Sequence, residues 1–122
     1  MYQENSRKVG FDKEEVAAEY LLQHGFRIKE RNFISKRGEI DIIGYDGEYL
    51  VFVEVKYRGK TALCNPLATV GGEKQKRICR TADFYRYQRK IGQEIPVRYD
   101  VIGIWEEKIE WIKNAFPHRF CR

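Results

Sequence analysis

The stretch GEIDIIGYDGEYLVFVEVK, from Gly38 to Lys56, has the pattern of two β-strands joined by a tight turn. Both halves are rich in β-branched and aromatic residues, and the Asp46-Gly47 pair between them is a strong signal for a short hairpin loop. We therefore predict strands over Gly38–Gly44 and Tyr49–Tyr57. Charged residues lie inside these strands rather than at their ends, and their placement needs a physical reason: Asp41, Glu54 and Lys56.

The charged residues of this hairpin share one face of the predicted sheet. A two-residue Asp46-Gly47 loop pairs Asp41 with Phe52, whereas a four-residue loop places Asp41 opposite Glu54. Both loops preserve the alternation of side chains, so the same charged residues lie together in either case: Glu39, Asp41, Glu54 and Lys56. This face is apolar only toward the turn, at Ile43, Leu50 and Phe52. The opposite face is entirely β-branched and is predicted to be buried: Ile40, Ile42, Val51, Val53 and Val55.

Carboxylates grouped on a sheet face are unfavourable without a cation. Like charges directly opposite each other destabilise a sheet by up to ~1 kcal/mol per pair, and burial adds a desolvation cost. A divalent cation removes this conflict, since Mg²⁺ prefers one or two carboxylates completed by water and phosphate oxygens. Asp41 and Glu54 supply two such carboxylates, and Lys56 points to the same side, where it can orient water. The alternative is a structural ion network in which Lys56 neutralises the acids.

The remaining elements are predicted from periodicity and from turn residues. A first helix spans Phe11–Gln23, with Asp12 as its cap and Glu15 as the capping partner. A strand over Phe26–Phe33, a helix from about Glu73 to Arg89 and a second hairpin complete the chain. The order α-β-β-β-α-β-β indicates one α/β (α+β) domain over residues 1–122, with a mixed sheet of about five strands and flanking helices. Residues 1–10 are expected to be flexible, and the second hairpin is formed by Val97–Trp105 and Ile109–Lys113.

The first helix offers one further acid. Its predicted apolar stripe comprises Val16, Ala17, Tyr20, Leu21 and His24. At 100° per residue Glu14 lies ~80° from the centre of this stripe, whereas Glu15 and Glu19 lie ~140–180° away. Glu14 is therefore the helix acid that can lean toward the sheet, where it would bind metal or position water. A position at the border of the stripe is equally compatible with a side chain that meets solvent.

Composition excludes several classes of protein and favours an anionic partner. The three cysteines form no CxxC pair and the two histidines lie far apart, which argues against a zinc site and for free thiols in a reducing cytoplasm. The sequence shows no signal peptide and no apolar run of membrane-spanning length. From Lys56 to Lys90, ten basic residues accompany two acidic ones, although the whole chain carries only +5. Such a basic block suits a polyanion, with nucleic acid as the expected partner and no membrane.

The second helix places four basic residues where they can contact a nucleic-acid backbone: Lys74, Lys76, Arg77 and Arg80. Phosphate contacts of this kind position a backbone without determining sequence preference. A solvated helix face remains the alternative. Stacking of bases on Tyr57, Trp105 and Trp111 is also weighed against a place for these rings in the core. Asp100 alternates with Tyr99 and Val101 and is interpreted as structural or as support for the site residues.

The motifs together resemble a known family. An aspartate followed by Glu-x-Lys on two hairpin strands, after an acidic helix, resembles the PD-(D/E)xK nuclease superfamily. The wider set resembles the YraN family of small bacterial predicted endonucleases, related in fold to archaeal Holliday-junction resolvases. It covers nearly the whole chain: EEVAAEYLLQHGF, ERNF, GEIDIIGYDG, LVFVEVKYR, EKQKRI, RYDVI and NAF. The chain departs from the family at Lys13, where a glycine is usual, and at Gly71-Gly72, where Thr-Pro is usual.

The resemblance implies a restriction-endonuclease-like fold and specific roles. The catalytic set that it implies is Glu14, Asp41, Glu54, Lys56 and Gln75, and the ligands of Mg²⁺ or Mn²⁺ are Asp41, Glu54 and Val55. Nucleic-acid contacts are assigned to Arg58, Lys74, Lys76, Arg77 and Arg80. The implied function is metal-dependent hydrolysis of DNA, more than RNA, selected by branch, flap or junction structure. A homodimer is compatible with this reading, since two nicks need two sites.

Two other function classes remain open. A non-catalytic nucleic-acid-binding module would keep the nuclease fold without turnover, although acids facing a polyanion bring no benefit to such a module. A subunit whose acidic face docks a basic protein is the third class. Loss of Asp41 separates them, because a nuclease then loses metal and activity while keeping its DNA affinity.

Overall fold

The computed structural model describes residues 6–57, 70–105 and 108–119. Its elements follow the predicted order, with a five-stranded sheet in the spatial order β1-β2-β3-β4-β5. Only β3 and β4 are parallel, and the other neighbours are antiparallel. The helices and strands are α1 (Ser6–Gln23), β1 (Arg27–Ser35), β2 (Gly38–Asp46), β3 (Tyr49–Tyr57), α2 (Gly72–Gln88), β4 (Val97–Trp105) and β5 (Lys108–Ile112). The predicted fold class, a single-sheet α+β fold with two helices, is confirmed.

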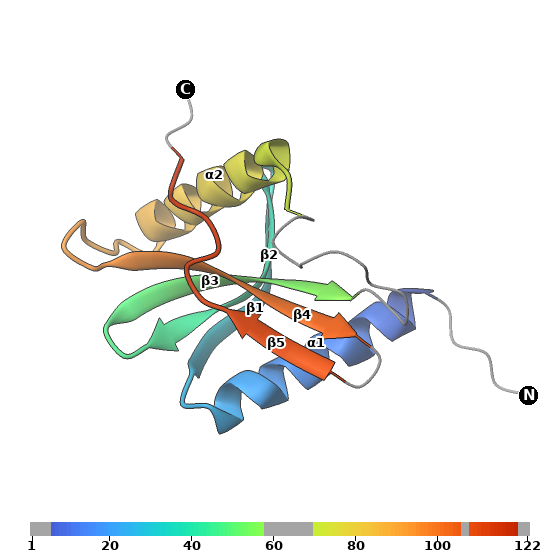
Figure 1. Ribbon diagram of the computed structural model, residues 1–122. Helices are drawn as coiled ribbons and strands as arrows, with labels where there is room; N and C mark the ends of the chain where they lie inside the picture. The colour runs from blue at the N-terminus through green and yellow to red at the C-terminus, as the bar shows by residue number, and fades with distance from the viewer. Residues whose placement is uncertain (1–5, 58–69, 106–107, 120–122) are drawn as a thin grey trace, which may run out of the picture.

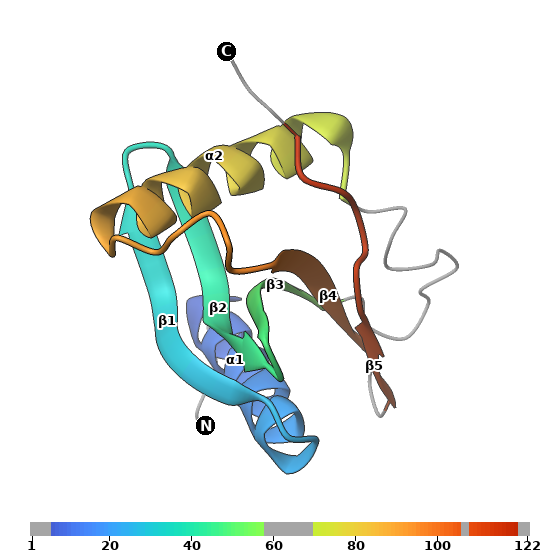
Figure 2. The same cartoon turned by 90° about the vertical axis from the view of Figure 1, so that its left-hand side faces the viewer.

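The two helices cover opposite faces of the sheet (Figures 1 and 2). α2 lies in the connection between β3 and β4, because parallel neighbours require a long crossover. A larger core cluster fills the α2 side, where Phe52, Tyr85 and Tyr99 make close ring contacts. A second cluster fills the α1 side, where Ala17, Ala18 and Leu21 pack on the sheet.

The first helix differs from its sequence prediction at its start and in its buried face. α1 begins at Ser6, so Asp12 lies within the helix and does not cap it. Gly10 lowers helix propensity by about 1 kcal/mol but does not by itself end a helix. The buried stripe is Ala17, Ala18 and Leu21, whereas Val16 is 39% exposed and His24 is exposed. The real stripe is thus rotated from the predicted one toward the side that carries Glu14.

The β2–β3 hairpin adopts the second of the two predicted registers. Ile42 pairs with Val53 and Asp46 with Tyr49, which leaves Gly47 and Glu48 as the turn. The turn prediction at Asp46-Gly47 is therefore wrong by one residue. Gly47 has φ +63°, a left-handed conformation that glycine adopts without steric cost. Most of the predicted β-branched face packs toward α1, but Ile40 joins the cluster beneath α2.

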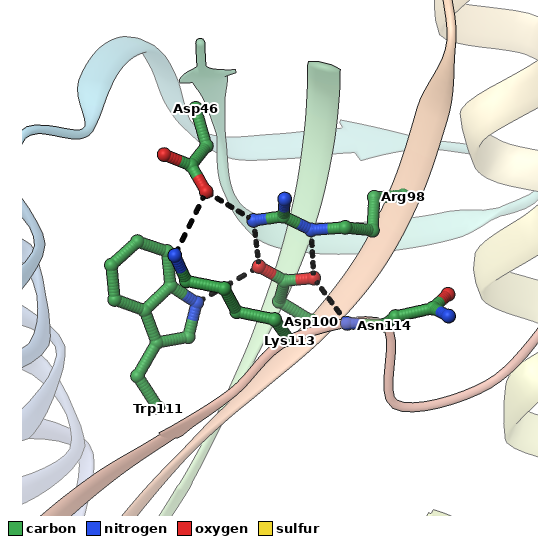
Figure 3. Close-up of polar contacts among 6 residues, drawn as sticks. All are labelled: Asp46, Arg98, Asp100, Trp111, Lys113 and Asn114. Carbon is green, nitrogen blue, oxygen red and sulfur yellow. Dashed lines mark hydrogen bonds and ion pairs between the residues drawn. The ribbon is translucent and has the colours of Figure 1, made fainter.

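A buried ion network ties the start of β4 to the β2–β3 turn and to the end of β5 (Figure 3). The fully buried carboxylate of Asp100 accepts two bonds from the Arg98 guanidinium, at 2.9 and 2.8 Å, and one from the Trp111 indole at 2.8 Å. The Asn114 main-chain N–H completes the set at 2.9 Å. Arg98 also donates to Asp46 at 2.7 Å, and its hydrogen bonds to Asp100 raise the pKa of the guanidinium. The structural interpretation of Asp100 is thus supported, and the Trp111 ring packs on Phe26 in the protein rather than standing free for a base.

Two further predictions concern membrane-spanning segments and the cysteines. Neither helix of the described chain combines the length and apolarity needed to cross a membrane. Cys79 is buried, and its sulfur accepts a hydrogen bond of 3.3 Å from the main-chain N–H of Arg119, whereas Cys64 and Cys121 lie outside the described residues.

Candidate active site

The candidate site forms where β2 separates from β3. The ladder between these strands runs from the turn to the Ile42–Val53 pair, while β2 continues to pair with β1 as far as Gly38. Beyond this pair a side chain replaces the ladder, because Asp41 Oδ2 accepts a hydrogen bond of 2.8 Å from the main-chain N–H of Val55. Asp41 is thereby held against the backbone of β3, next to Glu54.

A hollow of about 240 Å³ lies at this separation, between the strands and the first turns of α2. α2 approaches β2 closely at Gly38, because this residue has no side chain. A Cβ at this position would lie only 2.9 Å from Thr81 Oγ1. Gly38 also has φ +147°, which favours glycine. The hollow brings together three residues of β2, one of β3 and three of α2: Gly38, Glu39, Asp41, Glu54, Lys74, Arg77 and Ile78.

Glu54 is buried and is held by two lysines. Lys74 Nζ lies 2.6 Å and Lys56 Nζ 3.4 Å from the same oxygen, Glu54 Oε2. Burial and the neighbouring Lys74 ammonium lower the pKa of Lys56, although Glu54 acts in the opposite direction. Burial is the largest single effect on Lys74 and acts to lower its pKa, but its hydrogen bonds and the nearby charges of Glu54 and Asp41 together leave that pKa raised. Of the two, Lys56 is therefore the amine that loses its proton more readily.

Asp41 is the most perturbed carboxyl group of the site. Burial and the nearby charge of Glu54 raise its pKa from 3.8 to about 7, against the lowering effect of the Val55 hydrogen bond. Glu14 and Glu39 contribute in the same direction as Glu54. Asp41 therefore resists ionisation beside Glu54, and a bound cation would relieve this condition.

This pKa predicts a pH dependence of folding stability. Because the folded state keeps the Asp41 proton to a higher pH than the unfolded state, the group stabilises the fold most at low pH. The free energy of unfolding should then fall as pH rises from about 4 to about 7, and stay level above that range. Relative to Asp41→Asn, the wild type is expected to lose ~2–4 kcal/mol across this window. Urea unfolding from pH 4 to 8.5 measures it, with the exposed Glu48→Gln as control; parallel curves for wild type and Asp41→Asn would contradict the assignment.

Glu14 faces the sheet, which is one of the two orientations that the sequence left open, the other being toward solvent. Its side chain is only 12% exposed and lies 3.5 Å from Arg31 Nη2, whose other terminal nitrogen donates to Glu15 at 2.9 Å. Glu14 is close enough to Asp41 to raise its pKa, but it does not line the hollow. The structure thus places Glu14 beside the carboxylate pair, with Arg31 as its partner.

The residues predicted on α2 separate into different surroundings. Lys74 and Arg77 line the hollow with the carboxylates, whereas Gln75 does not. The Gln75 amide donates to the Val70 carbonyl at 2.8 Å, and its oxygen accepts from Arg119 at 2.8 Å. The exposed Lys76 and Arg80 lie on the same helix, and Arg58 lies outside the described residues. The role of Gln75 in the site stays a prediction.

The donor set fits a hard divalent cation. Within residues 6–57, 70–105 and 108–119 no group of three or more His, Cys, Asp or Glu side chains is arranged as a complete metal cage. Mg²⁺ does not need one, since it commonly uses one or two carboxylates and keeps several waters. Asp41 and Glu54 offer oxygen ligands only, and the hydrogen bond from Val55 brings Asp41 to the main chain of that residue. Both lysines contact Glu54 Oε2, and the closer of them, the Lys74 ammonium at 2.6 Å, would have to give way to such an ion.

Sequence reasoning missed two partners in this site. Arg31 was not singled out, although Arg31 pairs with Ile42 in the β1–β2 ladder and so lies next to the position of Asp41. Lys74 was assigned to phosphate contacts, whereas in the structure it binds Glu54. The pairing of β1 with β2 could have indicated Arg31. Only the packing of α2 over the hairpin reveals the role of Lys74.

The fold and the site define a small α+β protein with a carboxylate–lysine cluster at the separation of two strands. The chain belongs to the family described as uncharacterised protein family UPF0102, whose model matches residues 13–104, and this is the YraN family that the motifs resemble. A UPF0102 protein of Marinobacter nauticus is 46% identical over 120 residues, covering 94% of this chain and 97% of the relative. One from Lachnoclostridium phytofermentans is 41% identical over 112 residues, with 92% and 95% covered.

Proposed function

We propose that this protein is a metal-dependent nuclease that hydrolyses phosphodiester bonds of DNA, selecting its substrate by branch, flap or junction structure. The observation that carries the proposal is the hollow in which Asp41 and Glu54 face Lys74 and Arg77. Carboxylates suit a metal ion, and the adjoining cations suit the phosphate that the ion would share.

Asp41 and Glu54 would hold Mg²⁺ or Mn²⁺ through their carboxylates, with the Val55 carbonyl as the further oxygen. When bound, the ion neutralises phosphate charge and acidifies water in the site. Lys56, whose pKa is lowered, accepts the proton of the attacking water in its neutral form. As the new bond to phosphorus forms, the bond to the 3′ oxygen breaks, and this oxygen takes a proton from solvent. The products are a 5′-phosphate and a 3′-hydroxyl.

The cations of α2 would bind the substrate phosphate. Arg77 lines the hollow with an exposed side chain, and Lys74 becomes available to the same phosphate once Glu54 binds a metal ion. Charged contacts of this type are strongest where water is partly excluded. They carry no base preference, in agreement with a substrate chosen by its structure.

Cleavage of labelled linear duplex, single-stranded, flap and four-way-junction DNA tests the proposal. We expect cutting with Mg²⁺ or Mn²⁺, none with EDTA, and a preference for branched substrates. Glu54→Gln should reduce the rate by on the order of 10²-fold or more, since it removes one of two carboxylate ligands. The exposed Glu48→Gln is the matched control and should cut like the wild type. Cutting that survives EDTA would contradict a metal-dependent reaction.

A non-catalytic nucleic-acid-binding module is the second candidate. It is favoured by the two lysines on Glu54, which already neutralise this carboxylate without a metal ion. Calorimetric titration with Mg²⁺ separates the two, because a nuclease must bind the ion through Asp41 and Glu54. A folded wild type that neither binds Mg²⁺ nor cuts DNA would replace the nuclease proposal by the module.

A further inference from the structure

Two adjoining hollows lie along α2 beyond the carboxylate site. The smaller, of about 330 Å³, is lined by Arg37, Arg80, Asp83, Phe84 and Tyr87. The larger, of about 610 Å³, is lined by Asp83, Arg86, Tyr87, Lys90, Ile91, Gln93 and His118. Asp83 and Tyr87 line both, so the two hollows adjoin and Tyr87 lies at their common edge. None of the proposed catalytic residues lines it.

Tyr87 is the aromatic centre of this surface. Its side chain is 83% exposed, more than any other large hydrophobic residue in the described part of the chain. An exposed ring of this size contributes little to the core, whereas the neighbouring Tyr85 is 3% exposed and packs beneath the helix. A flat ring open to solvent is the feature on which an unpaired base stacks.

The charge around Tyr87 is predominantly positive. Four cations line the two hollows against the one carboxylate of Asp83, which lies 3.5 Å from His118 Nε2. The Arg37 guanidinium lies 4.3 Å from the centre of the Phe84 ring, and this stacked arrangement holds it at the rim. The four cations are Arg37, Arg80, Arg86 and Lys90. An exposed aromatic ring among cations is typical of surfaces that bind single-stranded nucleic acid.

The same helix connects this surface to the candidate active site. Arg77 lines the carboxylate hollow, and Arg80, one turn further along α2, lines the next hollow. Tyr87 follows Arg80 by seven residues and so lies on the same side of the helix. At 1.5 Å per residue, Lys74 and Tyr87 are ~20 Å apart along the axis, a distance that a short unpaired strand can span.

We propose that the surface formed by Arg37, Arg80, Arg86, Tyr87 and Lys90 binds an unpaired strand of the substrate, with a base stacked on Tyr87. The proposal rests on the nuclease function proposed above and specifies its substrate: a DNA with a single-stranded segment leading to the cutting site. Duplex DNA cannot use Tyr87 in this way, because its bases are already stacked within the helix. Phosphates of the strand lie against Arg80 and Arg37, and the strand continues along α2 to Arg77.

Fluorescence anisotropy in EDTA tests the proposal without cleavage. The probes are labelled oligothymidylate and a hairpin duplex of equal length. Tyr87→Ala is expected to weaken binding of oligothymidylate about tenfold or more and to leave duplex binding nearly unchanged. Tyr87→Phe should restore single-strand binding, because stacking needs the ring and not the hydroxyl. Arg80→Ala should weaken both probes, whereas the matched control Arg27→Ala, at the start of β1 beside the end of α1, should change neither.

Two results would overturn this assignment. One is oligothymidylate binding that Tyr87→Ala leaves unchanged. The other is that polyglutamate binds as tightly as oligothymidylate and that Tyr87→Ala does not weaken the binding of polyglutamate. This result would indicate a charged surface for an acidic protein. Because these measurements are made without a metal ion, they do not depend on cutting. If cleavage fails but binding depends on Tyr87, only the nuclease proposal is wrong. If the protein cleaves DNA but its binding does not depend on Tyr87, only the strand-binding surface is wrong.

Discussion

Replacement of Asp41 by alanine should reduce DNA cleavage by on the order of 10³-fold or more. Asp41 lines the hollow with Glu54, and its carboxylate is held against β3 by the Val55 N–H. Removing it deletes one of the two side-chain ligands proposed for the metal ion. Affinity for DNA should stay the same or increase, because a negative charge that faces the phosphates disappears. Single-turnover cleavage rates and anisotropy on the same branched DNA measure the two quantities.

The loss of cleavage without a loss of DNA affinity makes the Asp41→Ala experiment decisive. A variant that is misfolded loses cutting and binding together, whereas a ligand variant loses only cutting. Circular dichroism and urea unfolding check the fold. At pH 8 the loss of this charge should not destabilise the variant, because the raised pKa of Asp41 means that its ionised form is unfavourable in the folded state. Glu48→Ala, in the β2–β3 turn, is the control for removal of an acid. Equal losses of cleavage and affinity in a folded Asp41→Ala would mean that the residue has a structural role.

Replacement of Asp100 by alanine should destabilise the fold by about 3–5 kcal/mol. The carboxylate is 1% exposed and accepts hydrogen bonds from Arg98, from Trp111 and from the main chain of Asn114. Alanine leaves the Arg98 guanidinium, only 12% exposed, with Asp46 as its remaining carboxylate partner in the network. The guanidinium is then only partly compensated, and the Trp111 indole and the Asn114 main-chain N–H lose their acceptor, so the loss comes from these buried donors.

Urea unfolding with a fitted m-value measures this loss, and thermal unfolding should show a decrease in Tm of about 10 °C or more. Asp100→Asn should also destabilise the protein, because an amide cannot accept all four bonds. Glu110→Ala, an exposed acid on the neighbouring strand β5, should stay within about 0.5 kcal/mol of wild type. A double change of Arg98→Met with Asp100→Leu recovers part of the stability if the buried charge is the cause. A loss below 1 kcal/mol for Asp100→Ala would contradict this account.

The local pattern of residues determined most of the architecture. Alternation in the Gly38–Lys56 hairpin was sufficient to group Asp41 with Glu54, since a strand places every second side chain on one face. The strand Val97–Trp105 was predicted with the bounds that the structure has. Turn residues and helical periodicity predicted the order of elements, because both depend on neighbours within a few positions. The carboxylate pair of the site was therefore available from the sequence.

Contacts between distant segments were decided only by the tertiary structure. The sequence left the hairpin register and the direction of Glu14 open, and packing resolved both: β2 pairs with β3 only from Ile42 onward, and α1 buries Ala18 instead of Val16. Lys74 reaches Glu54 because α2 crosses back over the hairpin to connect two parallel strands. Local propensity contains no information on which distant side chain will neutralise a buried charge. That choice follows from the core, whose burial of apolar surface sets where each helix lies on the sheet.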